Sequence, residues 1–118
     1  MRLLKLTALF MLISSIGYTQ NNNSKTIFEV DGVCGMCKKR IEKASLKTKG
    51  VKSAIWNLET HQLQVIYDEQ KVDVETIKSN VSAAGHDTNT VKASNKAYGK
   101  LFKCCKYRDL KVIEEHKL

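Results

Sequence analysis

The chain has 118 residues and a formal charge of +8, with 20 Lys and Arg against 12 Asp and Glu. This length leaves room for one folded domain. The basic residues are scattered, without the aromatic–basic interleaving or recognition-helix pattern that nucleic-acid binding needs, so no nucleic-acid partner is expected.

The first twenty residues have the layout of a secretory signal peptide. Arg2 and Lys5 precede an apolar core from Leu6 to Ile16, which small and polar residues follow. This core is shorter than the roughly 20 residues of a bilayer-spanning helix. An uncleaved anchor is the alternative. We expect residues 1–20 to be removed, an exported and periplasmic protein, and no stable membrane insertion after cleavage.

After a polar linker at 21–24, strand-like and helix-like patterns alternate. Alternating apolar and polar residues indicate strands, and apolar residues three and four apart indicate helices. The patterns place a strand at 26–31, a helix from 36 to about 48, strands at 51–58 and 62–67, a helix from about 73 to 84, and a short last strand within 86–93. The order β-α-β-β-α-β predicts an α+β ferredoxin-like fold, with two helices on a four-stranded antiparallel sheet. Its predicted core consists of Phe28, Val30, Ile41, Val51, Trp56, Val65, Ile77 and Val81.

The residues after this predicted domain, which spans 25–93, have a different composition. Residues 94–118 are rich in lysine, with an apolar patch at 98–102 that leads into Cys104 and Cys105. A short amphipathic segment follows at 109–116. We interpret 94–118 as an appended C-terminal tail with a Cys-Cys pair.

Cys34 and Cys37 form a Cys-x-x-Cys pair where the first strand gives way to the first helix. Soft thiolates select soft ions such as Cu(I), and two sulfurs suffice for a near-linear site. A helix N-terminus and the basic residues at 38–40 are expected to lower the pKa of Cys37. A two-ligand site in a loop leaves the ion accessible, which suits handing it to another protein.

Other chemistries of the pair stay open. Zn(II) needs more ligands, and His86 with the tail cysteines would supply them. A thiol-disulfide oxidoreductase is the alternative from another class, because Cys-Gly-Met-Cys-Lys resembles the thioredoxin motif. Val33 in place of the usual Trp, and the absence of any proline, argue against it. A plain disulfide closes too short a loop to stabilise much. No nucleophile–base or paired-carboxylate pattern indicates an enzyme.

From residue 25 to about 92 the chain resembles the heavy-metal-associated domain family. The resemblance rests on Val-Asp-Gly-Val-Cys-Gly-Met-Cys at 30–37, Lys-Gly-Val at 49–51, Val-Ile-Tyr-Asp at 65–68 and Ala-Gly-His at 84–86. It implies that Cys34 and Cys37 bind the metal. It also implies metal relay, sequestration or detoxification, with Cu(I) favoured and Hg(II) as the principal alternative. A membrane metal transporter or another metal-binding protein would be the partner.

Two positions depart from the family pattern. Gly32 stands where the family usually has Met, so the packing beneath the loop is expected to differ. His86 stands where many members have an aromatic residue or Lys, and it is a candidate third ligand or a modulator of release; a solvent-facing loop residue is the alternative. His61, in the predicted hairpin, is expected at the far end.

Cys104 and Cys105 lie outside the resemblance. Adjacent cysteines form only a strained disulfide with each other. We treat them as conditional metal ligands that fold back on the loop or bind their own ion. A disulfide to Cys34 or Cys37, and dimerising thiols, are the alternatives.

Overall fold

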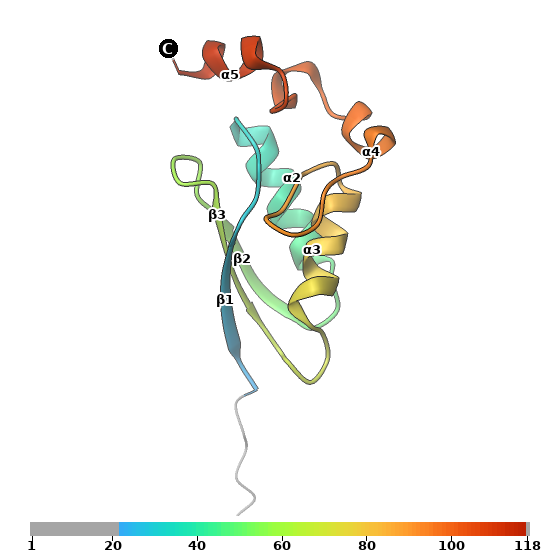
Figure 1. Cartoon of the computed structure of the whole chain (residues 1–118). Helices are drawn as coiled ribbons and strands as arrows, with labels where there is room; N and C mark the ends of the chain where they lie inside the picture. Colours follow the sequence, from blue (N-terminus) through green and yellow to red (C-terminus); the bar gives the residue numbers. More distant parts are fainter. Residues whose placement is uncertain (1–21, 118) are drawn as a thin grey trace, which may run out of the picture.

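The computed structural model describes residues 22–117 and has two layers, a sheet and a pair of helices on one of its faces (Figure 1). Within these residues the sheet has three antiparallel strands in the order β1-β3-β2: β1 (Ser24–Glu29), β2 (Val51–Trp56) and β3 (Gln62–Tyr67). The helices are α2 (Gly35–Leu46) and α3 (Val74–Ala83). The predicted signal peptide lies outside the described residues. No helix from 22 to 117 has the length and apolar character to cross a bilayer.

The fourth strand predicted within residues 86–93 does not form. Only a single bridge, from Val30 to Thr88, forms where it was expected. Thr88 then turns the chain: its amide and hydroxyl donate to the Val91 carbonyl at 2.8 and 3.0 Å, and the Val91 amide donates to that hydroxyl at 2.9 Å. The polar side chain thus competes with a strand ladder for the backbone groups. The α+β architecture is retained with three strands instead of four.

The core lies between the sheet and the two helices, as the sequence periodicity predicts. Seven of the eight predicted core residues are buried, and Val51 is half-buried. Trp56, Ile41 and Leu63 are the largest side chains with no exposed surface. Burial of each large apolar side chain contributes about 1.5–3 kcal/mol. This apolar layer fixes the sheet against both helices.

The helix ends have different causes. Asp73 caps α3 by accepting a hydrogen bond from the Thr76 amide at 2.8 Å. Gly85 ends the same helix with a φ of 108°, which favours glycine. Helix α2 has neither a capping side-chain hydrogen bond nor an acidic residue in its first turn. The first amides of α2 therefore remain available to the cysteine loop.

The C-terminal tail, residues 94–117 here, folds across the end of the sandwich where α2 begins (Figure 1). It contains α4 (Asn95–Gly99), the 3₁₀ helix η1 (Lys103–Cys105) and α5 (Leu110–His116). The tail buries Leu101, Cys105, Tyr107 and Val112. The amphipathic segment predicted at 109–116 is α5.

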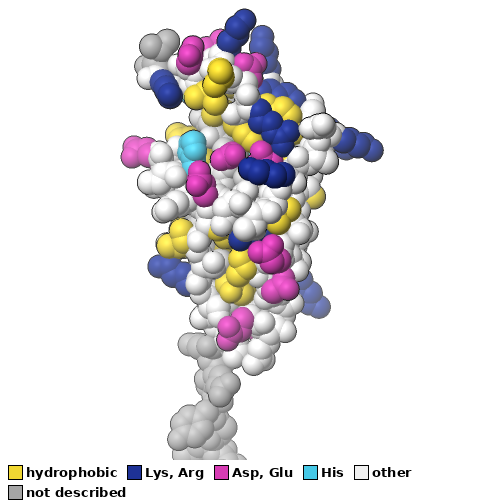
Figure 2. Space-filling view, viewed as in Figure 1, with side chains coloured by type: hydrophobic (Ala, Val, Ile, Leu, Met, Phe, Trp, Pro, Cys, Tyr) yellow, Lys and Arg dark blue, Asp and Glu magenta, His cyan; other side chains and the backbone are white. Residues whose placement is uncertain are grey.

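The charged surface has no single continuous basic face in the view of Figure 2. Lys and Arg side chains are scattered among acidic ones and are densest over the tail, at the top of the view. This distribution fits a solvated surface.

Candidate metal centre

Cys34 and Cys37 lie at the start of α2, as predicted. Cys34 has an extended backbone (φ −146°, ψ 173°), and its carbonyl accepts the first helical hydrogen bond from the Lys38 amide at 3.0 Å. The two Sγ atoms are 3.4 Å apart. A disulfide needs about 2.05 Å, so both are free thiols.

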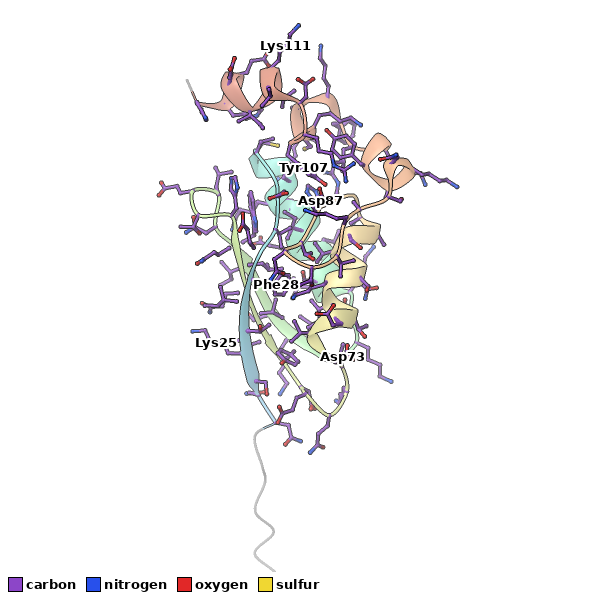
Figure 3. The ribbon with its side chains drawn as sticks, in the orientation of Figure 1. Lys25, Phe28, Asp73, Asp87, Tyr107 and Lys111 are labelled. Carbon is purple, nitrogen blue, oxygen red and sulfur yellow. The ribbon has the colours of Figure 1, made fainter. Side chains whose placement is uncertain are left out.

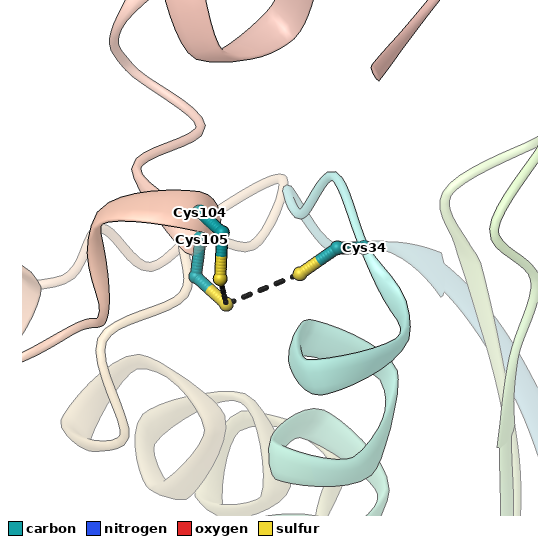
Figure 4. A group of neighbouring side chains, drawn as sticks. All are labelled: Cys34, Cys104 and Cys105. Atoms are coloured by element: carbon teal, nitrogen blue, oxygen red, sulfur yellow. Dashed lines mark hydrogen bonds between the residues drawn. The ribbon is translucent and has the colours of Figure 1, made fainter. Parts of the chain in front are cut away.

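The tail brings the other two cysteines to the same place. Cys105 Sγ lies 3.2 Å from Cys34 Sγ, across a separation of 71 residues in the sequence. Cys104 Sγ lies 4.0 Å from Cys105 Sγ and 3.6 Å from Met36 Sδ. The sulfurs of Cys34, Cys104 and Cys105 all lie within 4.8 Å of one another and face a common point (Figure 4). The structure therefore unites the tail pair with the loop.

Burial divides the four thiols into an inner and an outer pair. Cys37 and Cys105 are fully buried, Cys34 is partly buried and Cys104 is exposed. Burial raises the pKa of Cys34, but hydrogen bonds from the Cys37 amide and the Cys105 thiol outweigh it, so its pKa falls below the ordinary value. Burial raises the pKa of Cys37, so the expectation that the helix start lowers it is wrong for this thiol. Burial also raises the pKa of Cys105 to about 11. Cys34 is thus the thiol that ionises first among these three.

Arg40 supplies positive charge beside the thiols. Arg40 lies one turn along α2 from Cys37, and its guanidinium opposes the rise that burial causes in the pKa of the Cys105 thiol. The guanidinium also lies 5.9 Å from the centre of the exposed Phe102 ring. An anionic sulfur cluster at this point would face a fixed cation.

His86 is buried and neutral, so the alternative of a solvent-facing residue is wrong. Its Nδ1 is 2.8 Å from the Asp31 carbonyl, which can only accept, so Nδ1 carries the proton. Its Nε2 then accepts from Arg40 at 3.5 Å. Burial lowers the pKa of His86 to about 4, and Arg40 adds to this effect against the opposing hydrogen bond to Asp31. His86 lies outside the group of three sulfurs; as a metal ligand it stays a prediction.

A cluster of polar and aromatic contacts holds the tail against the residues after α3 (Figure 3). The Tyr107 hydroxyl donates to the Gly85 carbonyl at 2.7 Å and accepts from the Asp87 amide at 2.9 Å. Its ring stacks on His86 with centroids 5.5 Å apart. Arg108 pairs with the buried Asp87 carboxylate at 2.8 Å, and its guanidinium lies 4.3 Å from the centre of the Tyr98 ring. These contacts position Cys105.

The space beneath the loop is filled by Trp56. A Cβ atom added to Gly32 would lie 3.0 Å from both the Trp56 ring and Cys37 Cβ, so the loop and the ring need glycine to pack this closely. The indole nitrogen donates to the Val30 and His61 carbonyls at 3.0 and 3.2 Å. His61 stacks on this ring, with centroids 5.4 Å apart, so the expectation that it lies at the far end is wrong.

A small α+β sandwich with a pair of thiols at the start of its first helix defines a class of soft-metal-binding domain. The comparisons identify the family: residues 27–87, just over half of the chain, match the heavy-metal-associated domain, and the chain belongs to that family. It is a heavy-metal-binding domain that is similar in sequence to copper chaperones.

Similar proteins and solved structures support this family assignment. The chain is 42% identical over 65 residues to the copper chaperone CopZ of Staphylococcus aureus (strain JH9), covering 54% of this chain and 96% of that one. A solved CopZ metallochaperone is 41% identical with a TM-score of 0.54, over 55% of this chain and 98% of its own. The N-terminal domain of a potential copper-translocating P-type ATPase from Bacillus subtilis, solved in the Cu(I)-loaded state, is 30% identical. Its TM-score is 0.53, over 56% of this chain and 84% of its own.

Sequence reasoning expects Tyr98, Leu101 and Phe102 to anchor the tail. Leu101 is buried and Tyr98 packs on the core, whereas Phe102 is exposed, and the polar contacts of Tyr107 and Arg108 were missed. Cys104 and Cys105 lie beyond the family match, which ends at residue 87. Nothing in the local sequence pairs Tyr107 and Arg108 with residues about twenty positions earlier. The available signal was chemical: a second pair of soft ligands in a chain that already carries one.

Proposed function

We propose that this protein binds Cu(I) through Cys34 and Cys37 and relays or sequesters it. The observation that carries the proposal is the 3.4 Å approach of two free thiols at an uncapped helix start. The lowered pKa of Cys34 favours the thiolate form that binds the ion. Thiolate ligands favour Cu(I) over harder ions. The chain's likeness to copper chaperones supports this ion.

Two other ions compete with Cu(I) in this proposal. Hg(II) is also soft and suits the same two sulfurs. Zn(II) prefers a closed tetrahedral set. Among the described residues, the mutually close group contains three cysteines and does not include Cys37, so a closed four-sulfur set is not preformed.

We propose binding and relay, not catalysis, in an exported protein of the periplasm. The apolar core at 6–16 with its basic start supports export. The likeness to a metal-binding domain of a copper-translocating P-type ATPase supports a membrane transporter or another metal-binding protein as the exchange partner. Fractionation of cells and N-terminal sequencing of the mature chain test export.

Anaerobic titration of the reduced protein with Cu(I), against a competing chelator, tests the ion. The double variant Cys34→Ser, Cys37→Ser is expected to lose roughly 10³-fold in affinity, about 4 kcal/mol. Parallel titrations with Hg(II) and Zn(II) rank the ions. Disulfide reductase activity without tight Cu(I) binding would instead support the oxidoreductase.

A further inference from the structure

We propose that the tail completes the metal site. Cys105 is a third thiolate ligand of the ion, and the exposed Cys104 is an entry ligand that Cys37 replaces as the ion moves inward. This inference rests on the proposed function, and it names ligands that lie outside the family match.

The inner position is centred on Cys34, whose sulfur lies close to those of Cys37 and Cys105; Cys37 is outside the mutually close group and approaches Cys105 as the ion moves inward. Cys34 Sγ lies 3.4 Å from Cys37 Sγ and 3.2 Å from Cys105 Sγ. With the metal–sulfur bond of about 2.3 Å known for thiolate sites, three sulfurs around one ion lie about 4 Å apart. Both distances reach that spacing with a shift of under about 1 Å. They are farther from the roughly 2.05 Å of a disulfide.

The outer position shares two of these sulfurs. Cys34 and Cys105 also form a close group with Cys104, with all three sulfurs within 4.8 Å. Met36 Sδ lies 3.6 Å from Cys104 Sγ, and the Met36 side chain is 43% exposed. A thioether and a thiol at the surface are both soft ligands for an arriving ion. The route therefore runs from an exposed sulfur pair to a buried thiol.

The inward step is an exchange of ligands. The bond from the ion to Cys104 breaks as the bond to Cys37 forms. Cys37 releases its proton and Cys104 takes one up, so the charge of the cluster is unchanged. Copper stays Cu(I), and no electron moves.

The surrounding charge suits three thiolates. Cu(I) with three thiolates carries a net charge of −2, and the Arg40 guanidinium, 5.9 Å from the ring of Phe102 in the same tail, supplies a nearby positive charge. His86 holds this guanidinium through Nε2, since its own Nδ1 is fixed by the Asp31 carbonyl. Arg40 and His86 are therefore positioning residues in this site.

Single cysteine variants of the full chain separate the two roles. Cys105→Ser is expected to weaken Cu(I) binding roughly 10²-fold, because a ligand held in place adds a large effective concentration. X-ray absorption at the copper edge should then show two sulfurs per ion instead of three. Cys104→Ser should leave affinity within about twofold and keep three sulfurs, but slow transfer to a chelator roughly tenfold. Unchanged affinity and sulfur number in Cys105→Ser would overturn the third ligand. Unchanged transfer in Cys104→Ser would overturn the entry role.

A variant that keeps every sulfur tests whether displacement of the tail, and not only loss of a cysteine, weakens Cu(I) binding. Arg108→Ala removes the pairing with Asp87 and should weaken Cu(I) binding in the same direction as Cys105→Ser, whereas Lys111→Ala, an exposed tail residue, should not. Thermal unfolding of each variant shows whether the sandwich remains folded. Equal binding in wild type and Arg108→Ala would count against a tail-supplied ligand. If the wild type itself fails to bind Cu(I), the proposed function fails and not only this inference.

Discussion

Different interactions stabilise the sandwich and the tail. The sandwich, residues 22–93, buries a periodic set of apolar side chains between its sheet and two helices. The tail adds Leu101, Cys105 and Tyr107 to the edge of this apolar cluster, and polar contacts of Tyr107 and Arg108 join it to the segment from Gly85 to Asp87. Loss of one large side chain from the apolar layer should destabilise the whole sandwich, whereas loss of one polar contact of the tail should loosen the tail alone. The two regions should therefore respond separately to single substitutions.

The largest effect is expected from a substitution in the core of the sandwich, which also supports the tail. Trp56→Ala removes a fully buried ring and should destabilise the fold by about 4 kcal/mol. Denaturant unfolding followed by circular dichroism measures this. Ile55→Ala, on the 55% exposed neighbour in the same strand, is the matched control and should change stability by under about 0.5 kcal/mol. Equal losses in the two variants would contradict the layered core.

The next effect depends on pH and acts where the two regions meet. His86 has an ordinary pKa of 6.5 and a folded pKa of about 4, so the unfolded chain binds more protons between these values. Stability should be full above pH 6.5 and fall as pH drops toward 4, by up to about 3 kcal/mol. Asp31, Asp87, Arg40 and Tyr107 also face this region.

The comparison with His86→Gln isolates the histidine, because the other charged groups are common to both proteins. The measurement is the free energy of unfolding of each metal-free protein at pH 7 and pH 4.5. The wild type should lose more stability than the variant over this range. An equal loss in both would assign the acid sensitivity to the carboxylates.

A smaller effect acts on the cysteine loop alone. Gly32→Ala forces a Cβ to within 3.0 Å of Trp56 and Cys37, and this overpacking should cost about 2 kcal/mol and weaken Cu(I) binding. Gly35→Ala is the control within the same loop, because a Cβ there meets nothing within 4 Å. Thermal unfolding and Cu(I) titration should leave Gly35→Ala close to wild type. Similar behaviour of both variants would show that Trp56 does not shape the loop.

The smallest effect loosens the tail and spares the sandwich. Tyr107→Phe removes the hydroxyl that bonds the Gly85 carbonyl and the Asp87 amide, at a cost of about 1–2 kcal/mol. Hydrogen exchange should become faster from 101 to 117 and stay unchanged in β2 and β3. Faster exchange throughout the sandwich would mean that the two regions unfold together.

The sequence predicts the sandwich well because its signals are local and repeated. The observed bounds of β3 equal the predicted 62–67, and α3 lies within one residue of its predicted ends. The fourth strand fails because Thr88 bonds the backbone of Val91, a choice that strand propensity does not register. Strand propensity ranks residue types by how often they occur in strands, whereas the hydrogen bonds of the Thr88 hydroxyl determine this particular turn.

For the candidate site, the sequence predicts which residues carry chemistry but not which of them meet. Cys34 and Cys37 follow from their spacing at a helix start. The meeting of Cys34 with Cys105 depends on the path of the tail, which Tyr107 and Arg108 determine through contacts with residues far along the chain. The burial of His86 depends on the same tail, because the Tyr107 ring lies against it. Tertiary contacts of this kind leave no periodic trace.

The separation of 71 residues between Cys34 and Cys105 also orders events during folding. Cys34 and Cys37 come together as soon as α2 forms, whereas the contact with Cys105 must close a long loop, which costs more conformational entropy. Each new molecule should therefore offer two sulfurs before it offers three. The affinity of the protein for Cu(I) would therefore rise during folding, with the docking of the tail as the final step.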